Sequence, residues 1–297
     1  MHLLSHYAIV FIAACAICTR ANAQNDVQNP APAPTVASST CKNSNATPLS
    51  LFWELEPASN CGTFAIRGYK PISLAVVASD TVNTMPTSAA PTHTGTYQPY
   101  NTSETRIQIS MRTKVAEGLF TLGSAGRLDS VWFAYSQQSY WQLFNKDLSR
   151  PFRATDHEPE IMYIFPLDMT IGKGWRLRYV GASVNHQSNG QSLPLSRSWN
   201  RVIAKAGMEY GNTFLVNANL WQRMPEDAST DDNPDIEDLV GRAEITGIWY
   251  LNEKNSLGAT VRHSLKADAN GSIRLTWWNK LARSDTDSRN GLRFFSE

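Results

Sequence analysis

The sequence has few charges, few cysteines and, after its first residues, no long apolar run. Only 18% of its 297 residues are Asp, Glu, Lys or Arg, against the ~25% usual in soluble domains. Lys and Arg number 27 and Asp and Glu number 26, so the chain lacks the basic excess typical of nucleic-acid partners. Beyond residue 23, no stretch reaches the ~18 apolar residues of a membrane-spanning helix. These shortages argue against nucleic-acid binding and against membrane-spanning helices. They do not exclude a membrane protein that is built from strands.

The N-terminus has the pattern of a secretory signal peptide. Residues 3–16 are nearly all apolar, and the small-residue string ANA at 21–23 is a cleavage site. The string IAAC at 12–15 resembles a lipobox and leaves a lipoprotein as the alternative. We therefore expect a signal peptide at 1–23, a flexible periplasmic lead-in at 24–50, rich in Ala, Pro, Ser and Thr, and one barrel domain at 51–297.

Only two of the four cysteines lie outside the signal peptide. Cys41 and Cys61 form a pair in an exported chain, and such a pair is expected to form a disulfide. A zinc site is not indicated, because there is no CxxC string and no histidine cluster beside them.

The rest of the chain alternates between apolar and polar residues with a period of two, which predicts strands. The alternation is cleanest in 106–116, 200–210, 239–251 and 257–265. A soluble sandwich would turn the apolar row to a core, whereas a membrane barrel would turn it to lipid. The segments approach the ~9–11 residues of a membrane strand and exceed the ~5–6 of soluble strands. Aromatic residues at segment ends, including Trp175, Trp199, Trp221 and Trp249, suit interfacial girdles.

We therefore predict an all-β, antiparallel transmembrane β-barrel. In this fold the row that carries Arg201, Lys205 and Glu209 faces the lumen and forms a polar network. The acidic loop residues Asp231, Asp232 and Asp235 are expected to be solvated, with metal binding as the alternative. His157 and His263 have no evident partners in the sequence and are expected to be structural or surface residues.

One predicted hairpin, residues 184–201, carries candidate catalytic residues. His186 and Ser188 are two residues apart and share a strand face, and Asn200 falls on the same apolar row of the returning strand. Polar side chains on a lipid-facing row are costly unless they have a function. Histidine can take the proton of a serine hydroxyl, and the asparagine amide oxygen can fix the histidine tautomer. The alternative is a polar hairpin end without chemistry.

Four strings resemble a known family in the same order. They are NHQSNGQSLPLSRSWNR (185–201), WELEPASNCGTFAIRGYKP (53–71), SQQSYWQLFNKDLSRPFRATDHEPE (136–160) and STDDNPD (229–235). All four are similar to outer membrane phospholipase A, a twelve-stranded barrel enzyme of Gram-negative bacteria. The resemblance implies calcium-dependent hydrolysis of phospholipid acyl esters (phospholipase A1 or A2) in the outer membrane, by a homodimer. By the same match, Ser188 is the nucleophile, His186 the general base and Asn200 the residue that orients it.

The resemblance also implies a calcium site and a dimer interface. The matched ligands are the backbone carbonyl of Gln191, Ser196, and Ser149 from a second copy of the chain; Gln137 matches a polar residue of the dimer interface. Relatives often have Arg at position 191, a change that a backbone ligand tolerates. They often have Asp at 193, so Leu193 weakens a calcium site available to the monomer.

The end of the chain departs from the family pattern. After Trp278 only residues 279–297 remain, where the family has two further strands. In the family's count the sequence reaches only part of an eleventh strand, and our hypothesis is a truncated or frameshifted chain that lacks the last strand. The alternative function is a catalytically impaired or porin-like barrel, and a third is a secreted β-sandwich esterase.

Overall fold

Antiparallel strands make up most of the structure, a computed structural model that describes residues 46–121, 126–267 and 271–280. Within these residues, three short helical segments accompany the strands: α1 (Pro48–Trp53), the 3-10 turn η2 (Pro57–Ser59) and α2 (Ile236–Val240). The strands are β1 (Ile66–Gly68), β2 (Ser73–Ala78), β3 (Ser103–Glu117), β4 (Ser130–Trp141), β5 (Ala154–Gly172), β6 (Trp175–Ser188), β7 (Ser198–Tyr210), β8 (Phe214–Arg223), β9 (Ala243–Tyr250), β10 (Asn255–His263) and β11 (Gly271–Asn279).

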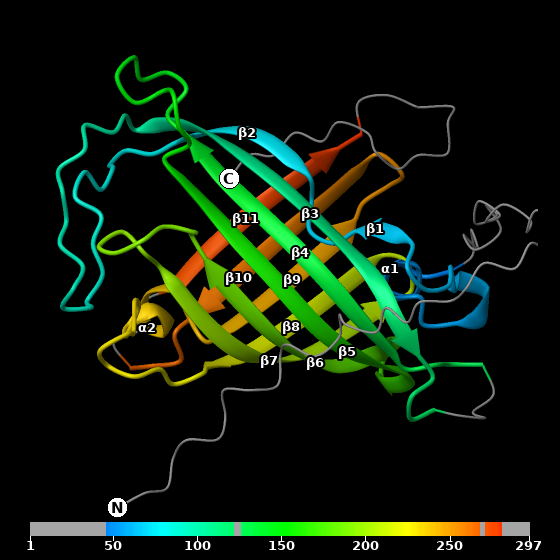
Figure 1. Ribbon diagram of the computed structural model, residues 1–297. Coiled ribbons are helices and arrows are strands. Elements are labelled where there is room, and N and C mark those ends of the chain that lie inside the picture. Colours follow the sequence, from blue (N-terminus) through cyan, green and yellow to red (C-terminus); the bar gives the residue numbers. More distant parts are fainter. Residues whose placement is uncertain (1–45, 122–125, 268–270, 281–297) are drawn as a thin grey trace, which may run out of the picture. The chain divides into compact units, whose positions relative to one another are not determined.

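These strands form one curved sheet in which each strand from β3 onward pairs with the next along the chain (Figure 1). β1 and β2 both pair with β3 and share one edge, while β11 forms the other edge among the described strands. The all-β antiparallel prediction is confirmed. The sheet is not closed within the described residues. The predicted signal peptide, most of the lead-in, Cys41 and residues 281–297 lie outside those residues.

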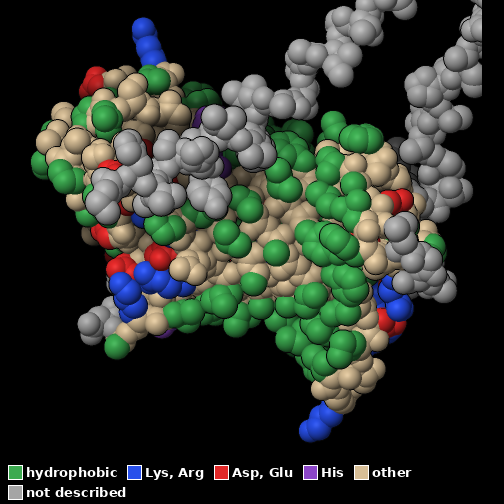
Figure 2. Space-filling view, turned by 60° about the horizontal axis from the view of Figure 1, so that its bottom comes forward, with side chains coloured by type: hydrophobic (Ala, Val, Ile, Leu, Met, Phe, Trp, Pro, Cys, Tyr) green, Lys and Arg blue, Asp and Glu red, His purple; other side chains and the backbone are tan. Residues whose placement is uncertain are grey.

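The two faces of the sheet differ as the alternation predicts for a barrel. On the outer face, Val184 and Ile245 are 52% and 53% exposed. On the inner face, Lys114 and Arg178 are only 1% and 2% exposed. Figure 2 shows hydrophobic side chains spread over the outer face, with charged side chains toward the strand ends. A soluble sandwich would have the opposite arrangement.

Ion pairs on the inner face link side chains of β5, β6 and β7. Lys205 Nζ lies 2.8 Å from Glu160 Oε1, and Arg201 Nη2 lies 2.8 Å from Glu158 Oε1. Glu209 Oε1 lies 3.0 Å from Arg178 Nε. Buried charges persist only when they are paired in this way, and the predicted lumenal network is therefore confirmed.

The helix α1 packs against the inner face. Leu49 and Trp53, one turn apart, are buried on the same side of the helix. The Trp53 ring packs edge-on against Trp132, with centroids 5.8 Å apart, and lies 5.6 Å from the Tyr179 ring. The Leu49 backbone N–H donates to Glu209 Oε2 at 3.3 Å. The lumen therefore contains an aromatic core, and Pro48 to Ser50, at the end of the predicted lead-in, belong to this packed helix.

Long loops gather at one end of the sheet, and three of the connections at the other end are tight turns. Residues 79–102, 142–153, 189–197 and 224–242 form the long loops, whereas 173–174, 211–213 and 251–254 are tight turns. Two sequence predictions are corrected at the loop end. Leu239 and Val240 lie in α2 instead of a strand, and Trp199 and Trp221 point inward and are buried, so they belong to no outer girdle.

The aromatic residues at the turn end do lie together. Trp175 packs against Tyr210 and Phe214, and Phe214 stacks on Trp249 with ring centroids 5.6 Å apart. Within the described ranges, no helix has the length and apolar character needed to cross a membrane.

Candidate active site

The candidate site lies at the loop end of the β6–β7 hairpin. Cross-strand pairing places His186 opposite Asn200 and Ser188 opposite Ser198. The loop that joins the strands is held by the Asn189 side chain, whose Oδ1 accepts from the Arg197 backbone N–H at 2.9 Å. Gly190 adopts φ 64° in this turn, a left-handed conformation that glycine adopts at low cost. The hairpin predicted from the sequence is therefore present, with its two strands in fixed register.

His186 and Asn200 are joined by a hydrogen bond on the outer face. His186 Nδ1 and Asn200 Oδ1 are 2.8 Å apart. Because an amide oxygen only accepts, Nδ1 carries the proton and Nε2 is left as a base. Ser188 lies two residues further along β6, on the same face as His186. All three candidate residues are half-buried.

A second imidazole lies beside Ser188. His157, on β5, is the cross-strand partner of Ser188, and the Tyr135 hydroxyl lies 2.6 Å from His157 Nδ1. The same hydroxyl donates to Gln137 Oε1 at 3.2 Å. The outer face thus carries a continuous polar row from Gln137 to Asn200. Strand parity alone places His157 on this row, but only the β5–β6 register brings it opposite Ser188.

Three loops meet around Ser196. Its hydroxyl donates to Asp232 Oδ2, and its carbonyl lies 2.8 Å from His93 Nε2. His93 Nε2 also lies 3.3 Å from Asp232 Oδ1, so this nitrogen, which faces two acceptors, carries a proton. Asp232 is only 9% exposed. The prediction of a solvated acidic loop is therefore wrong for Asp232, and His93 was not recognised from the sequence because the 79–102 loop has no periodic pattern.

The other candidate ligands lie in neighbouring loops. The Ser149 carbonyl accepts from Trp141 Nε1 at 2.7 Å, which leaves one lone pair of this oxygen. Gln191 lies two residues after Asn189 in the β6–β7 loop, and its backbone N–H donates to Asn189 Oδ1. Burial lowers the pKa of the Arg197 guanidinium, and the charge of Asp232 acts in the opposite direction. No group of three or more His, Cys, Asp or Glu side chains suited to a metal occurs in the described part of the chain.

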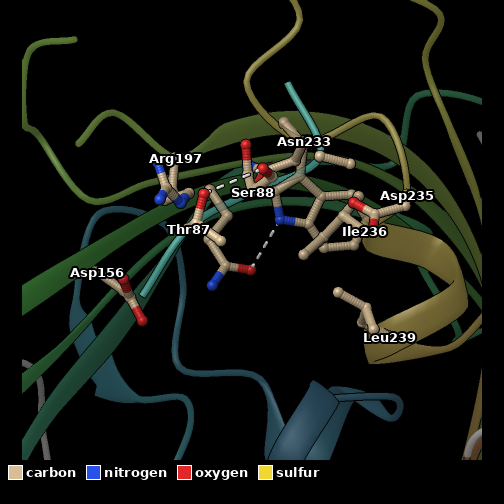
Figure 3. Close-up of a pocket in the computed structure, with 11 residues that line it drawn as sticks. Thr87, Ser88, Asp156, Arg197, Asn233, Asp235, Ile236 and Leu239 are labelled. Carbon is tan, nitrogen blue, oxygen red and sulfur yellow. Dashed lines mark hydrogen bonds between the residues drawn. The ribbon is translucent and has the colours of Figure 1, made fainter. Parts of the chain in front are cut away.

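A cavity of about 510 Å³ opens on the inner side of these loops (Figure 3). Trp199 and Gln187 line it, and the Trp199 indole donates to Gln187 Oε1 at 3.3 Å. Both residues alternate with members of the candidate site and so point to the opposite face of the sheet. The cavity is therefore separate from the outer-face site.

Comparison with known proteins identifies the family to which the chain belongs. The family described as phospholipase A1 matches residues 49–295, and the chain belongs to this family. A putative phospholipase A1 of Neisseria meningitidis serogroup B is 37% identical over 227 residues, which are 74% of this chain and 57% of that protein. The phospholipase A1 of Salmonella typhimurium is 39% identical over 150 residues, 50% of this chain and 48% of the relative. The chain thus spans about half the length of the curated relatives it matches.

Two solved structures share the fold. Outer membrane phospholipase A from Escherichia coli has a TM-score of 0.62 and 29% identity, and the match covers 74% of this chain and 85% of that chain. The outer membrane phospholipase dimer of Salmonella typhi with bound calcium has a TM-score of 0.61 and 27% identity, with 74% and 80% covered. The names of these relatives describe an ester hydrolase, in agreement with the predicted reaction class.

Proposed function

We propose that this chain is an outer-membrane phospholipase in which Ser188 is the nucleophile, His186 the general base and Asn200 the residue that orients His186. The hydrogen bond of 2.8 Å between His186 Nδ1 and Asn200 Oδ1 carries the proposal. It selects the tautomer in which Nε2 is unprotonated, and a base in this state is what a serine nucleophile requires.

The reaction then follows from the proton positions. His186 Nε2 takes the proton of the Ser188 hydroxyl as its oxygen attacks the ester carbonyl. The protonated imidazole returns that proton to the departing glycerol oxygen, and an acyl-enzyme remains on Ser188. Water, activated by His186 in the same way, releases the fatty acid. Asn200 stabilises the imidazolium through its dipole, less strongly than a carboxylate would.

Calcium fits the oxygen atoms available in the loops. A hard cation takes hydroxyl, carbonyl and carboxylate oxygens as ligands. The loops that meet around Ser196 offer its hydroxyl beside the buried carboxylate of Asp232. We propose that Ser196 and the Gln191 carbonyl hold calcium together with Ser149 of a second copy of the chain. When bound, calcium would polarise the ester carbonyl as a Lewis acid.

The outer face supports a lipid setting for this site. Exposed Val184 and Val202 lie on the two strands that carry His186 and Asn200, so the acyl chains of a phospholipid would meet apolar side chains beside Ser188. We propose that the face around Gln137 forms a homodimer interface, which would bring the second Ser149 to the site.

Substitution of the nucleophile and base tests the proposal. Ser188→Ala and His186→Ala should each abolish calcium-dependent release of fatty acid from phospholipid micelles. Labelling of the wild-type protein with a long-chain fluorophosphonate, followed by mass spectrometry, should modify Ser188.

Ser198→Ala is the matched control. Ser198 is the β7 partner of Ser188 on the same face, so this variant removes an equivalent hydroxyl and should keep the activity. Full activity of Ser188→Ala would contradict the proposed function. Single-channel conductance without hydrolysis would favour the porin-like alternative.

A further inference from the structure

The Asn200 amide has a partner at each end. Its Oδ1 lies 2.8 Å from His186 Nδ1, and its Nδ2 donates to Glu226 Oε1 at 3.2 Å. Glu226 belongs to the loop that follows β8. No motif in the sequence marks it, because the contact depends on how this loop folds back over β7.

The orientation of this amide decides whether His186 can act as a base. A half-turn about the last side-chain bond of Asn200 exchanges the amide oxygen and nitrogen with little change of shape. In the exchanged orientation, Nδ2 would donate to His186 Nδ1, and the imidazole proton would move to Nε2. An imidazole protonated at Nε2 cannot take a proton from Ser188.

Glu226 selects the productive orientation. A carboxylate only accepts hydrogen bonds, so it can pair with Nδ2 of Asn200 and not with Oδ1. In the exchanged orientation two oxygen atoms would face each other, and both hydrogen bonds of the amide would be lost or reversed. A neutral partner that both donates and accepts would not make this selection.

The protein holds Glu226 in place. The Met224 backbone N–H donates to the Asn200 carbonyl at 2.8 Å, which fixes the start of the loop beside β7. The second carboxylate oxygen, Oε2, lies 3.8 Å from Arg223 Nη2. Arg223 is itself paired with Asp231 further along the loop. The Glu226 side chain is 20% exposed, so it keeps partial contact with water.

We propose that Glu226 is a positioning residue of the hydrolytic reaction, which locks the Asn200 amide with its oxygen toward His186. This inference rests on the proposed function of Ser188, His186 and Asn200. Glu226 transfers no proton; it polarises the amide, and the Asn200 oxygen becomes a better acceptor for the imidazolium that forms during attack.

Single substitutions give the first test. Glu226→Ala should lower kcat about tenfold, the lower end of the effect of a hydrogen bond to a charged group. KM and the calcium concentration for half-maximal activity should stay unchanged, because the partners of Glu226 are Asn200 and Arg223 and not the proposed calcium ligands. Asp227→Ala is the matched control: it removes the next acidic side chain of the same loop, whose hydrogen bonds are with Ser229, and should keep kcat.

A double substitution separates positioning from a merely structural role. In Asn200→Asp, two carboxylates would face each other, so the activity should fall and its pH profile should shift. Adding Glu226→Gln supplies an amide donor to the new carboxylate at position 200 and should restore activity above that of Asn200→Asp alone. Heat-modifiable gel mobility verifies that every variant is folded.

The outcomes distinguish the two proposals. If Ser188→Ala is inactive while Glu226→Ala retains wild-type kcat, the positioning role is refuted and the proposed function stands. A double variant no more active than Asn200→Asp would also refute the positioning role. If Ser188→Ala is active, the proposed function itself fails.

Discussion

Gly207 occupies a point of close packing where a single methyl group should destabilise the fold. This glycine lies on the inner face of β7, opposite Tyr179 of β6. A Cβ added there would lie 2.1 Å from Tyr179 Cε1 and 2.9 Å from Asn217 Oδ1. The Tyr179 ring cannot move away freely, because it packs on Trp53 and its hydroxyl donates to Asn217 Oδ1 at 2.9 Å.

The expected loss follows from three contributions to the free energy of unfolding. Overpacking of a core by one methyl group costs about 1–3 kcal/mol. Displacing the Tyr179 hydroxyl removes a hydrogen bond worth about 0.5–1.5 kcal/mol. Replacing glycine by alanine returns about 0.4–1 kcal/mol by restricting the unfolded chain. Gly207→Ala should therefore lower the free energy of unfolding by about 0.5–4 kcal/mol.

Gly247→Ala is the control within the same sheet. A Cβ at Gly247, on β9, meets nothing within 4 Å, so only the backbone contribution remains and stability should be unchanged or slightly raised. Urea unfolding in lipid vesicles, followed by tryptophan fluorescence, measures both variants. Equal midpoints for Gly207→Ala and wild type would refute the packing argument.

Three further predictions concern pH, calcium and lipid. Burial acts to raise the pKa of Asp129, but hydrogen bonds from Thr121 and Tyr163 outweigh it and lower the pKa. The charged Asp129 therefore stabilises the fold above pH ~4, and this contribution is lost as the pH falls below that value. Asp129→Asn should lower the free energy of unfolding by about 1–3 kcal/mol at neutral pH. In urea titrations at acid pH, the difference between this variant and wild type should be smaller. Ser196→Ala should raise the calcium concentration for half-maximal activity about tenfold or more, measured by calcium titration of fatty-acid release. Ile245→Arg on the outer face should cost about 2–4 kcal/mol in vesicles, and no loss would contradict a lipid-facing position.

The sequence predicted the sheet well because alternation carries the same information along every strand. Val202 and Lys205 fall on opposite rows in the sequence and on opposite faces in the structure. The strand predicted over 239–251 begins too early. Leu239 fits the apolar row of this strand in the sequence, but it lies in α2, and Gly241, with φ 105°, separates α2 from β9. Trp199 and Trp221 were misplaced for a different reason, since an aromatic residue near a strand end suits either face.

The candidate site was predictable to the extent that it lies on strands. Spacing along the hairpin brought His186, Ser188 and Asn200 onto one row, and the β6–β7 register places His186 opposite Asn200. His93, Asp232 and Glu226 reach the site from loops, where no period links sequence distance to position in space. Their contacts follow from loop packing and only a structure could supply them.

The placement of α1 also has a consequence for the order of assembly. The Leu49 backbone binds Glu209, a residue 160 positions later, and Trp53 fills the space between the inner faces of β4 and β6. A helix enclosed by a curved sheet is difficult to insert once the strands around it have paired. The contact between α1 and Glu209 can therefore form only once β7 is in place, although α1 precedes the strands in the sequence. Contacts between residues so distant in sequence are slow to form, so we expect the docking of α1 to be a late step of folding.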